Sequence, residues 1–104
     1  MKIVKVVYTT KPEYAEQNSA NIKTVMSDLQ QLNRSGMFYN TCLGADGKTF
    51  THTAFFKSDE DEQVLIKLPS FIQFQQQLKA SSPEAPPKQE LLTLVGWSKD
   101  IFNF

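Results

Sequence analysis

Apolar residues change their spacing along the chain, and the first third predicts a strand followed by a helix. Residues Lys2 to Thr9 are β-branched and apolar, which is typical of a strand. Thr10 and Glu13 then stand in capping-box spacing, and Gly36 suits the left-handed residue that ends a helix. Between them, the apolar stripe of one helix comprises Tyr14, Ile22, Val25, Leu29 and Leu32.

The middle of the chain predicts a hairpin and then a broken helix. Asp46-Gly47 separates two β-rich runs, residues 37–44 and 48–56, and is a strong signal for a tight hairpin turn. Ser58 is expected to cap a helix with an acidic first turn, and Pro69 should break that helix after Leu68. Past the break, one helical face carries Phe71, Phe74, Gln75 and Leu78.

The last quarter predicts a connector and a fourth strand. Three prolines between Ser81 and Lys88 exclude a helix or a central strand, so we expect a stiff connector there. Gln89 to Trp97 is predicted to be a strand. The order strand, helix, strand, strand, broken helix, strand favours one α+β domain over residues 1–104, with the ferredoxin-like βαββαβ arrangement. In that fold, two helices cover one face of an antiparallel four-stranded sheet.

Strand residues alternate between the two faces of a sheet, and here both faces carry apolar side chains. One face is expected to carry Val4, Val6, Tyr8, Phe50, Ala54 and Phe56, and the other Ile3, Val7 and Phe55. Two helices cover only one face, and soluble monomers seldom expose a large apolar patch. We therefore expect a homodimer that pairs two sheets into a dimeric α/β barrel. The alternative is that Thr49, Thr51 and Thr53 keep the second face polar enough to meet water.

Composition narrows the classes of partner. Eleven basic and eleven acidic residues cancel and no basic stripe is present, so neither nucleic acid nor a membrane surface is an expected partner. Cys42 is the single cysteine, which excludes an intramolecular disulfide and a cysteine metal site, and no metal site is expected. No stretch has the pattern of a signal peptide or a membrane span, so the expected location is cytoplasmic.

Two segments carry a resemblance to a known superfamily. Lys11-Pro12-Glu13 opens the first helix, and Leu68-Pro69-Ser70-Phe71-Ile72-Gln73-Phe74 forms the break in the second. With these segments the chain resembles the dimeric α/β-barrel superfamily, most closely its antibiotic-biosynthesis-monooxygenase-like and stress-responsive A/B-barrel domains. The resemblance spans nearly the whole chain and implies a small-molecule pocket between the sheet and the helices.

The same resemblance bears on cofactors. Haem-degrading members of the superfamily use an Asn on the first strand and a Trp and a His on the second helix. Val6 occupies the matching first-strand position here, and Ser70 and Phe71 fill the place of the His. Haem degradation is therefore not expected, and neither is another cofactor.

His52, the only histidine, is the candidate catalytic residue. It lies on the third strand among Phe50, Ala54 and Phe56, so its side chain should point into the space beneath the helices. A neutral imidazole there could act as a general base near neutral pH. The alternative is a core or interface histidine whose ring nitrogens are satisfied by neighbouring groups.

Aromatic residues are the candidate ligand contacts. Their rings and hydroxyls could hold a flat apolar or aromatic molecule by stacking and hydrogen bonding. For each of them the alternative is ordinary packing in the core or at an interface. The candidates are Tyr8, Tyr14, Tyr39, Phe50, Phe56, Phe71 and Trp97.

Three functions stay open from the sequence. The first is the binding of a small apolar or aromatic molecule between the sheet and the helices. The second, implied by the resemblance, is a cofactor-independent monooxygenase in which His52 removes an acidic substrate proton and the carbanion reacts with oxygen. The third is a non-catalytic structural or interaction domain. A cavity with His52 and a tyrosine hydroxyl facing inward would favour ligand chemistry, and a solid core filled by phenylalanines would favour the third function.

Overall fold

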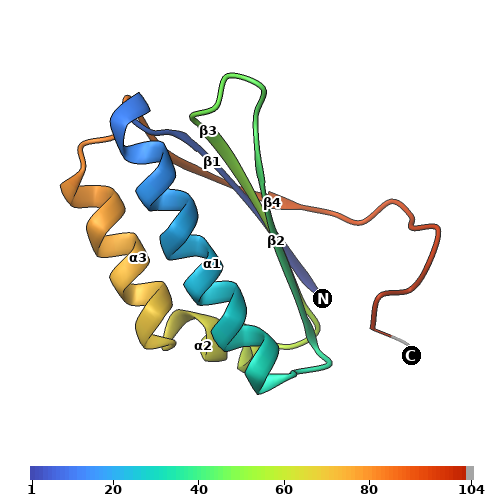
Figure 1. Ribbon diagram of the computed structural model, residues 1–104. Coiled ribbons are helices and arrows are strands. Elements are labelled where there is room, and N and C mark those ends of the chain that lie inside the picture. Colours follow the sequence, from blue (N-terminus) through green and yellow to red (C-terminus); the bar gives the residue numbers. More distant parts are fainter. Residues whose placement is uncertain (103–104) are drawn as a thin grey trace.

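The computed structural model of the protein describes residues 1–102. Its elements are β1 (Lys2–Thr9), the short 3₁₀ turn η1 (Pro12–Tyr14), α1 (Ala15–Leu32), β2 (Met37–Leu43), β3 (Thr49–Phe56), α2 (Asp59–Ile66), α3 (Pro69–Ala80) and β4 (Ala85–Leu92). The strands form one antiparallel sheet in the order β2-β3-β1-β4. Figure 1 shows α1 and α3 side by side on one face of that sheet. The expected α+β, ferredoxin-like fold is confirmed.

The core lies between the helices and one face of the sheet. Burial alternates along β3, where Phe50, His52, Ala54 and Phe56 are buried and the threonines between them are half-buried. Tyr8 of β1 belongs to the same core, and Val4 and Val6 pack against it. The helices contribute Ala15, Ile22, Val25, Leu65, Phe74 and Leu78. The expected division of the β1 and β3 residues between the two faces is therefore confirmed.

The ends of α1 differ from the prediction. Thr10 does not cap the helix, because it is fully buried and its hydroxyl donates to the carbonyl oxygen of Lys48 at 3.3 Å instead. Asn33, with a φ of 49°, supplies the left-handed residue at the end of α1 in place of Gly36. Glycine is required at position 36 for a steric reason instead, since a Cβ at this position would overlap the carboxylate of Asp61.

The break between α2 and α3 sets the position of α3 over the sheet. Ser58 Oγ accepts a hydrogen bond from the N–H of Asp61 and caps α2, as predicted. Leu68 has extended backbone angles, φ −68° and ψ 122°, because the ring of Pro69 disfavours helical geometry at the preceding residue. Past this break, α3 turns Phe74 and Leu78 into the core.

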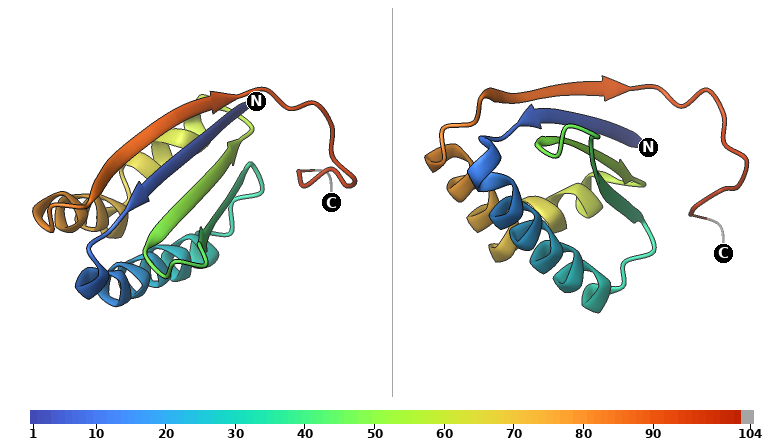
Figure 2. Two further views of the ribbon diagram at one scale, coloured as in Figure 1. Left: turned by 90° about the horizontal axis from the view of Figure 1, so that it is seen from above. Right: turned by 45° about the horizontal axis from the view of Figure 1, so that its top comes forward.

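The fourth strand begins and ends earlier than predicted. β4 spans Ala85–Leu92, so it includes Pro86 and Pro87, and residues 93–97 have no regular structure. β4 is an edge strand that pairs only with β1, and an edge tolerates proline because one side of its backbone has no partner strand. Figure 2 shows the chain beyond β4 projecting away from the sheet. Of the residues described, none belongs to a helix long and apolar enough to cross a membrane.

The face of the sheet away from the helices is mixed rather than uniformly apolar. Strand register aligns one apolar row across all four strands, formed by Phe38, Phe55, Ile3 and Leu92. The neighbouring row is polar and consists of Asn40, Thr53, Lys5 and Glu90. The β3 threonines lie on this face and make it more polar than a fully apolar interface. Leu92 and Leu91 fall on opposite faces, because they pair with Ile3 and Val4 respectively.

Candidate functional site

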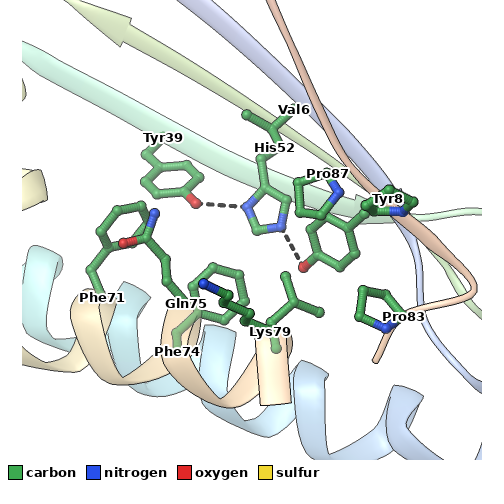
Figure 3. A pocket seen from close by; sticks show the side chains of 12 residues that line it. Val6, Tyr8, Tyr39, His52, Phe71, Phe74, Gln75, Lys79, Pro83 and Pro87 are labelled. Carbon is green, nitrogen blue, oxygen red and sulfur yellow. Dashed lines mark hydrogen bonds between the residues drawn. The ribbon is translucent and has the colours of Figure 1, made fainter. Parts of the chain in front are cut away.

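A cavity of about 340 Å³ lies between the sheet and α3, beside the connector to β4. Figure 3 shows strand side chains on one side of it and side chains of α3 on the other. Most of its lining is apolar or aromatic, as is typical of small-molecule sites. The lining residues are Val6, Tyr8, Tyr39, His52, Phe71, Phe74, Gln75, Leu78, Lys79, Pro83, Pro86 and Pro87.

His52 stands at the centre of a chain of hydrogen bonds in this cavity. The alternation of β3 turns its ring toward the helices, where it is only 4% exposed. Its Nε2 lies 2.8 Å from Tyr8 Oη, and its Nδ1 lies 2.6 Å from Tyr39 Oη and 3.0 Å from Thr41 Oγ1. Figure 3 shows the two tyrosine hydroxyls meeting the ring from opposite sides. Both ring nitrogens are therefore occupied.

Asn18 of α1 adds a buried donor to this chain of hydrogen bonds. Asn18 is fully buried and its Nδ2 donates to Tyr8 Oη at 2.8 Å. Tyr8 Oη still has its own proton to donate, and the neutral imidazole has two tautomers. In the tautomer that accepts this proton at Nε2, Nδ1 carries the imidazole proton and donates toward Tyr39 or Thr41. In that tautomer the Tyr39 hydroxyl keeps a proton that it can donate to a bound molecule.

The pKa shifts at the site keep every member of this chain neutral. Burial lowers the pKa of His52 to about 4, since desolvation disfavours the imidazolium. Burial likewise raises the pKa of Tyr8 and that of Tyr39 above the ordinary value of 10. At neutral pH the chain of His52, Tyr8 and Tyr39 is therefore an uncharged set of hydrogen-bond donors and acceptors.

Aromatic rings form the apolar wall of the cavity. The ring centroids of His52 and Phe74 lie 5.5 Å apart, those of Phe71 and Phe74 5.9 Å, and those of Tyr39 and Phe71 6.2 Å. These spacings fall in the range of offset and edge-to-face ring packing. A flat ring of a ligand could therefore pack against this wall by the same kinds of ring contact.

The structure brings some of the expected ligand contacts together and places others elsewhere. Tyr8, Tyr39, His52 and Phe71 line the cavity. Phe50 and Phe56 are packed in the core, at 2% and 3% exposure, and do not line it. Tyr14 packs at the edge of the core and accepts a hydrogen bond from Asn21, and Trp97 packs against Phe102 beyond β4. These four residues therefore lie outside the lining of the cavity.

Sequence reasoning missed Asn18, Lys79 and the prolines of the connector as parts of the site. A signal for Asn18 exists, because it is the polar member of the apolar stripe of α1, four residues from both Tyr14 and Ile22. A signal for Lys79 exists as well, because it follows Phe71 and Gln75 at intervals of four along one face of α3. The prolines carried no such signal, since they were expected to lie in a connector.

Comparison with known proteins supports the fold. No family model and no curated protein matches the sequence. Among solved structures, the chain is similar to Rv0793 of Mycobacterium tuberculosis, with a TM-score of 0.77 and 13% identity over 94% of this chain and 98% of that one. It is also similar to an antibiotic biosynthesis monooxygenase, with a TM-score of 0.76 and 12% identity over 92% of this chain and 100% of the other.

A third similar structure is SnoaB, a cofactor-independent oxygenase of Streptomyces nogalater. Its TM-score is 0.62 and its identity 13%, over 95% of this chain and 98% of that one. Identities this low show the fold alone. The protein has the fold of the antibiotic-biosynthesis-monooxygenase-like proteins, so the resemblance stated from the sequence is confirmed at the level of the fold.

Proposed function

We propose that this protein binds a small, mostly apolar or aromatic molecule in the cavity between the sheet and α3. The observation that carries the proposal is a cavity of about 340 Å³ whose apolar lining surrounds one polar chain centred on His52. Apolar walls with a few convergent polar groups are the usual design of ligand pockets. A core without space at this position would have supported a purely structural role.

The geometry also favours one orientation of the ligand. Its flat apolar part packs against Phe71 and Phe74, whose rings line the helix side of the cavity. An oxygen of the ligand accepts the proton of Tyr39, because the other hydrogen bonds of the chain are made within the protein. A ketone, quinone or phenol carries such an oxygen next to a flat ring.

Binding is tested by isothermal titration calorimetry with 2-naphthol. Val6 lines the cavity from β1, so Val6→Phe fills part of it and weakens binding by roughly tenfold or more. Val95→Phe is the matched control, because Val95 is fully exposed outside the cavity, and it leaves binding unchanged. Val6→Ala enlarges the cavity and retains binding. Equal affinity in all four proteins, or no binding to the wild type, contradicts the proposal.

A second candidate function is cofactor-independent oxygenation. It is supported by the His52 chain inside the cavity and by the fold shared with SnoaB, which is a cofactor-independent oxygenase. A substrate CH₂ group would give one proton to Tyr8 Oη while the proton of Tyr8 moves to Nε2 of His52. The carbanion would take up O₂, and the resulting peroxide would recover the proton from His52. Loss of water then leaves a carbonyl, so one oxygen atom enters the product and the other enters water.

Two features make oxygenation the second candidate rather than the first. Both nitrogens of His52 are already bonded, and its lowered pKa makes the imidazole a weak base. The test is oxygen uptake with anthrone, whose CH₂ group is acidic. If His52 is catalytic, His52→Ala abolishes oxygen uptake even at anthrone concentrations that saturate binding to the variant. Unchanged uptake in His52→Ala overturns the catalytic role alone.

We further propose that two copies pair through the face of the sheet that no helix covers, as a homodimer located in the cytoplasm. Support comes from Phe38, Phe55 and Leu92 of the apolar row, which are exposed or half-buried, and from exposed apolar residues beyond it, Val95 among them. Ile3 of the same row is already buried in the single chain. Burying this row against a second copy removes apolar surface from water. The polar row beside it would lie within the same contact.

A further inference from the structure

The rim of the cavity carries a positive charge, because Lys79 lines the cavity and is an exposed residue. Of the residues described, Lys79 is the only charged one in the lining, and no carboxylate lines the cavity. Within residues 1–102, the ammonium group of Lys79 forms no hydrogen bond or ion pair, and its backbone carbonyl accepts from the N–H of Ser82 at 3.2 Å. The acid that follows it along the connector has a partner. That acid, Glu84, pairs with Lys48 at 2.9 Å and is therefore already neutralised.

Position on the helix explains part of this arrangement. Lys79 lies in the last turn of α3, where a cation is favoured by the helix dipole. That preference explains why a cation lies in the last turn, but it does not determine which face of the helix carries the cation. Lys79 shares its face with Phe71 and Gln75, four residues apart in each case, and all three line the cavity. Figure 3 shows Gln75 and Lys79 reaching from α3 toward the space that His52 and Tyr39 face.

We propose that the ligand is an aromatic acid, a flat ring system that carries a carboxylate. The carboxylate pairs with the ammonium group of Lys79 and accepts a hydrogen bond from the amide of Gln75. The ring lies between Phe71 and Phe74 on α3 and the two prolines of β4. This inference rests on the proposed binding function and adds to it the charge of the ligand and the residue that selects for that charge.

The shape of the cavity is compatible with such a molecule. Its polar groups fall into two sets, the His52 chain on the sheet side and the pair of Gln75 and Lys79 on α3, with apolar side chains making up the rest of the lining. A ring with polar substituents at two positions satisfies both sets at once. A hydrocarbon would gain no hydrogen bond or ion pair from either set, so it would bind less tightly than such a ring.

Calorimetric titration with 2-naphthoate and its uncharged analogue 2-naphthamide tests the inference. The two probes share the ring and differ in charge. We expect the wild type to bind 2-naphthoate about threefold to tenfold more tightly than 2-naphthamide, the range of a partly exposed ion pair. Lys79→Gln removes this preference, and Lys79→Arg retains it. Added salt weakens 2-naphthoate binding to the wild type and leaves Lys79→Gln unaffected.

Lys23→Gln is the matched control, because it makes the same charge change on α1 at an exposed lysine outside this cavity. It should leave the preference for 2-naphthoate intact. Loss of preference in Lys23→Gln as well would mean attraction by net charge and would overturn the role of Lys79. Equal binding of both probes to the wild type overturns the preference for an acid and leaves the proposed binding function intact. Failure of both probes to bind overturns the proposed function and this inference together.

Discussion

His52 shows how a histidine is kept neutral inside an apolar cavity. Its partners are the hydroxyl groups of Tyr8, Tyr39 and Thr41, which can donate or accept as the tautomer requires. Burial is the cause of its lowered pKa. A charged imidazolium would donate from both ring nitrogens, so Tyr8 Oη would have to accept from Nε2. In the proposed site, His52 is therefore a neutral hydrogen-bonding group whose Nε2 reaches a bound molecule through the hydroxyl of Tyr8.

This lowered pKa predicts a loss of stability in acid. Because the folded pKa of about 4 lies below the ordinary 6.5, the unfolded chain takes up a proton first as the pH falls. The contribution of His52 to the free energy of unfolding should therefore be constant well above pH 6.5 and decrease by up to about 3 kcal/mol between pH 6.5 and 4.

Urea unfolding of the wild type and of His52→Gln at several pH values measures the effect. Glutamine cannot titrate, so the two stability curves should converge as the pH falls from 6.5 to 4. Other groups, such as Asp61 with its lowered pKa, titrate in both proteins and cancel in the comparison. Parallel curves over this interval would show that His52 is not held neutral by the fold.

Strand alternation was enough to predict that His52 and Tyr8 lie under the helices. Their hydrogen-bond partners could not be predicted, because Asn18 and Tyr39 approach through the packing of α1 and β2 against β3. Phe50 and Phe56 were predicted on the correct face but are packed in the core and do not line the cavity. Alternation gives the face of a side chain and leaves its neighbours across the core undetermined.

At the scale of elements, Gly36 allows the segment before β2 to pass close to α2. Asp61 of α2 accepts hydrogen bonds from Ser58 and from Arg34, whose Nε lies 3.0 Å from its Oδ1. Gly36 passes directly beside this carboxylate. The ion pair and its hydrogen bonds therefore connect the segment between α1 and β2 to the first turn of α2.

Gly36→Ala should destabilise the protein by about 1–3 kcal/mol, because its Cβ overlaps the Asp61 carboxylate and forces the backbone or the ion pair to move. Gly96→Ala is the matched control, since no atom lies within 4 Å of a Cβ built there, and it should have no effect. The midpoints of urea denaturation compare the two variants. Equal midpoints would show that the protein accommodates a Cβ at position 36 without a loss of stability.

The type and order of the elements followed from the sequence, and their ends did not. Pro86 and Pro87 were assigned to a connector, whereas an edge strand accepts them. Asn33 ends α1 because asparagine also tolerates the left-handed conformation, so the helix did not need to reach Gly36. Edge position and helix end both depend on tertiary packing, which local spacing does not report.

At the scale of the whole molecule, the proposed homodimer depends on the face of the sheet that no helix covers. A second copy would bury its apolar row, and its row containing Lys5 and Glu90 would have to pair within the contact. The sequence overstated how apolar this face is, because β4 ends at Leu92 and the apolar residues after it leave the sheet.

We expect light scattering after size-exclusion chromatography to give a mass of about twice the 11.8 kDa of one chain. Phe55→Lys places a charge in the apolar row and should yield a monomer. Ile72→Lys makes a comparable change on the exposed side of α3 and should remain a dimer. A monomeric wild type at micromolar concentration would overturn the proposed pairing.

The most direct test of the whole account is the location of a bound ligand. Valine and leucine methyl resonances, recorded by nuclear magnetic resonance during titration with 2-naphthol, report it residue by residue. Binding in the cavity predicts shifts at Val6 and Leu78, with Val7 on the opposite face of β1 and Val95 beyond β4 unchanged. Unmoved resonances at Val6 and Leu78, or larger shifts at Val7, would contradict a binding site between the sheet and α3.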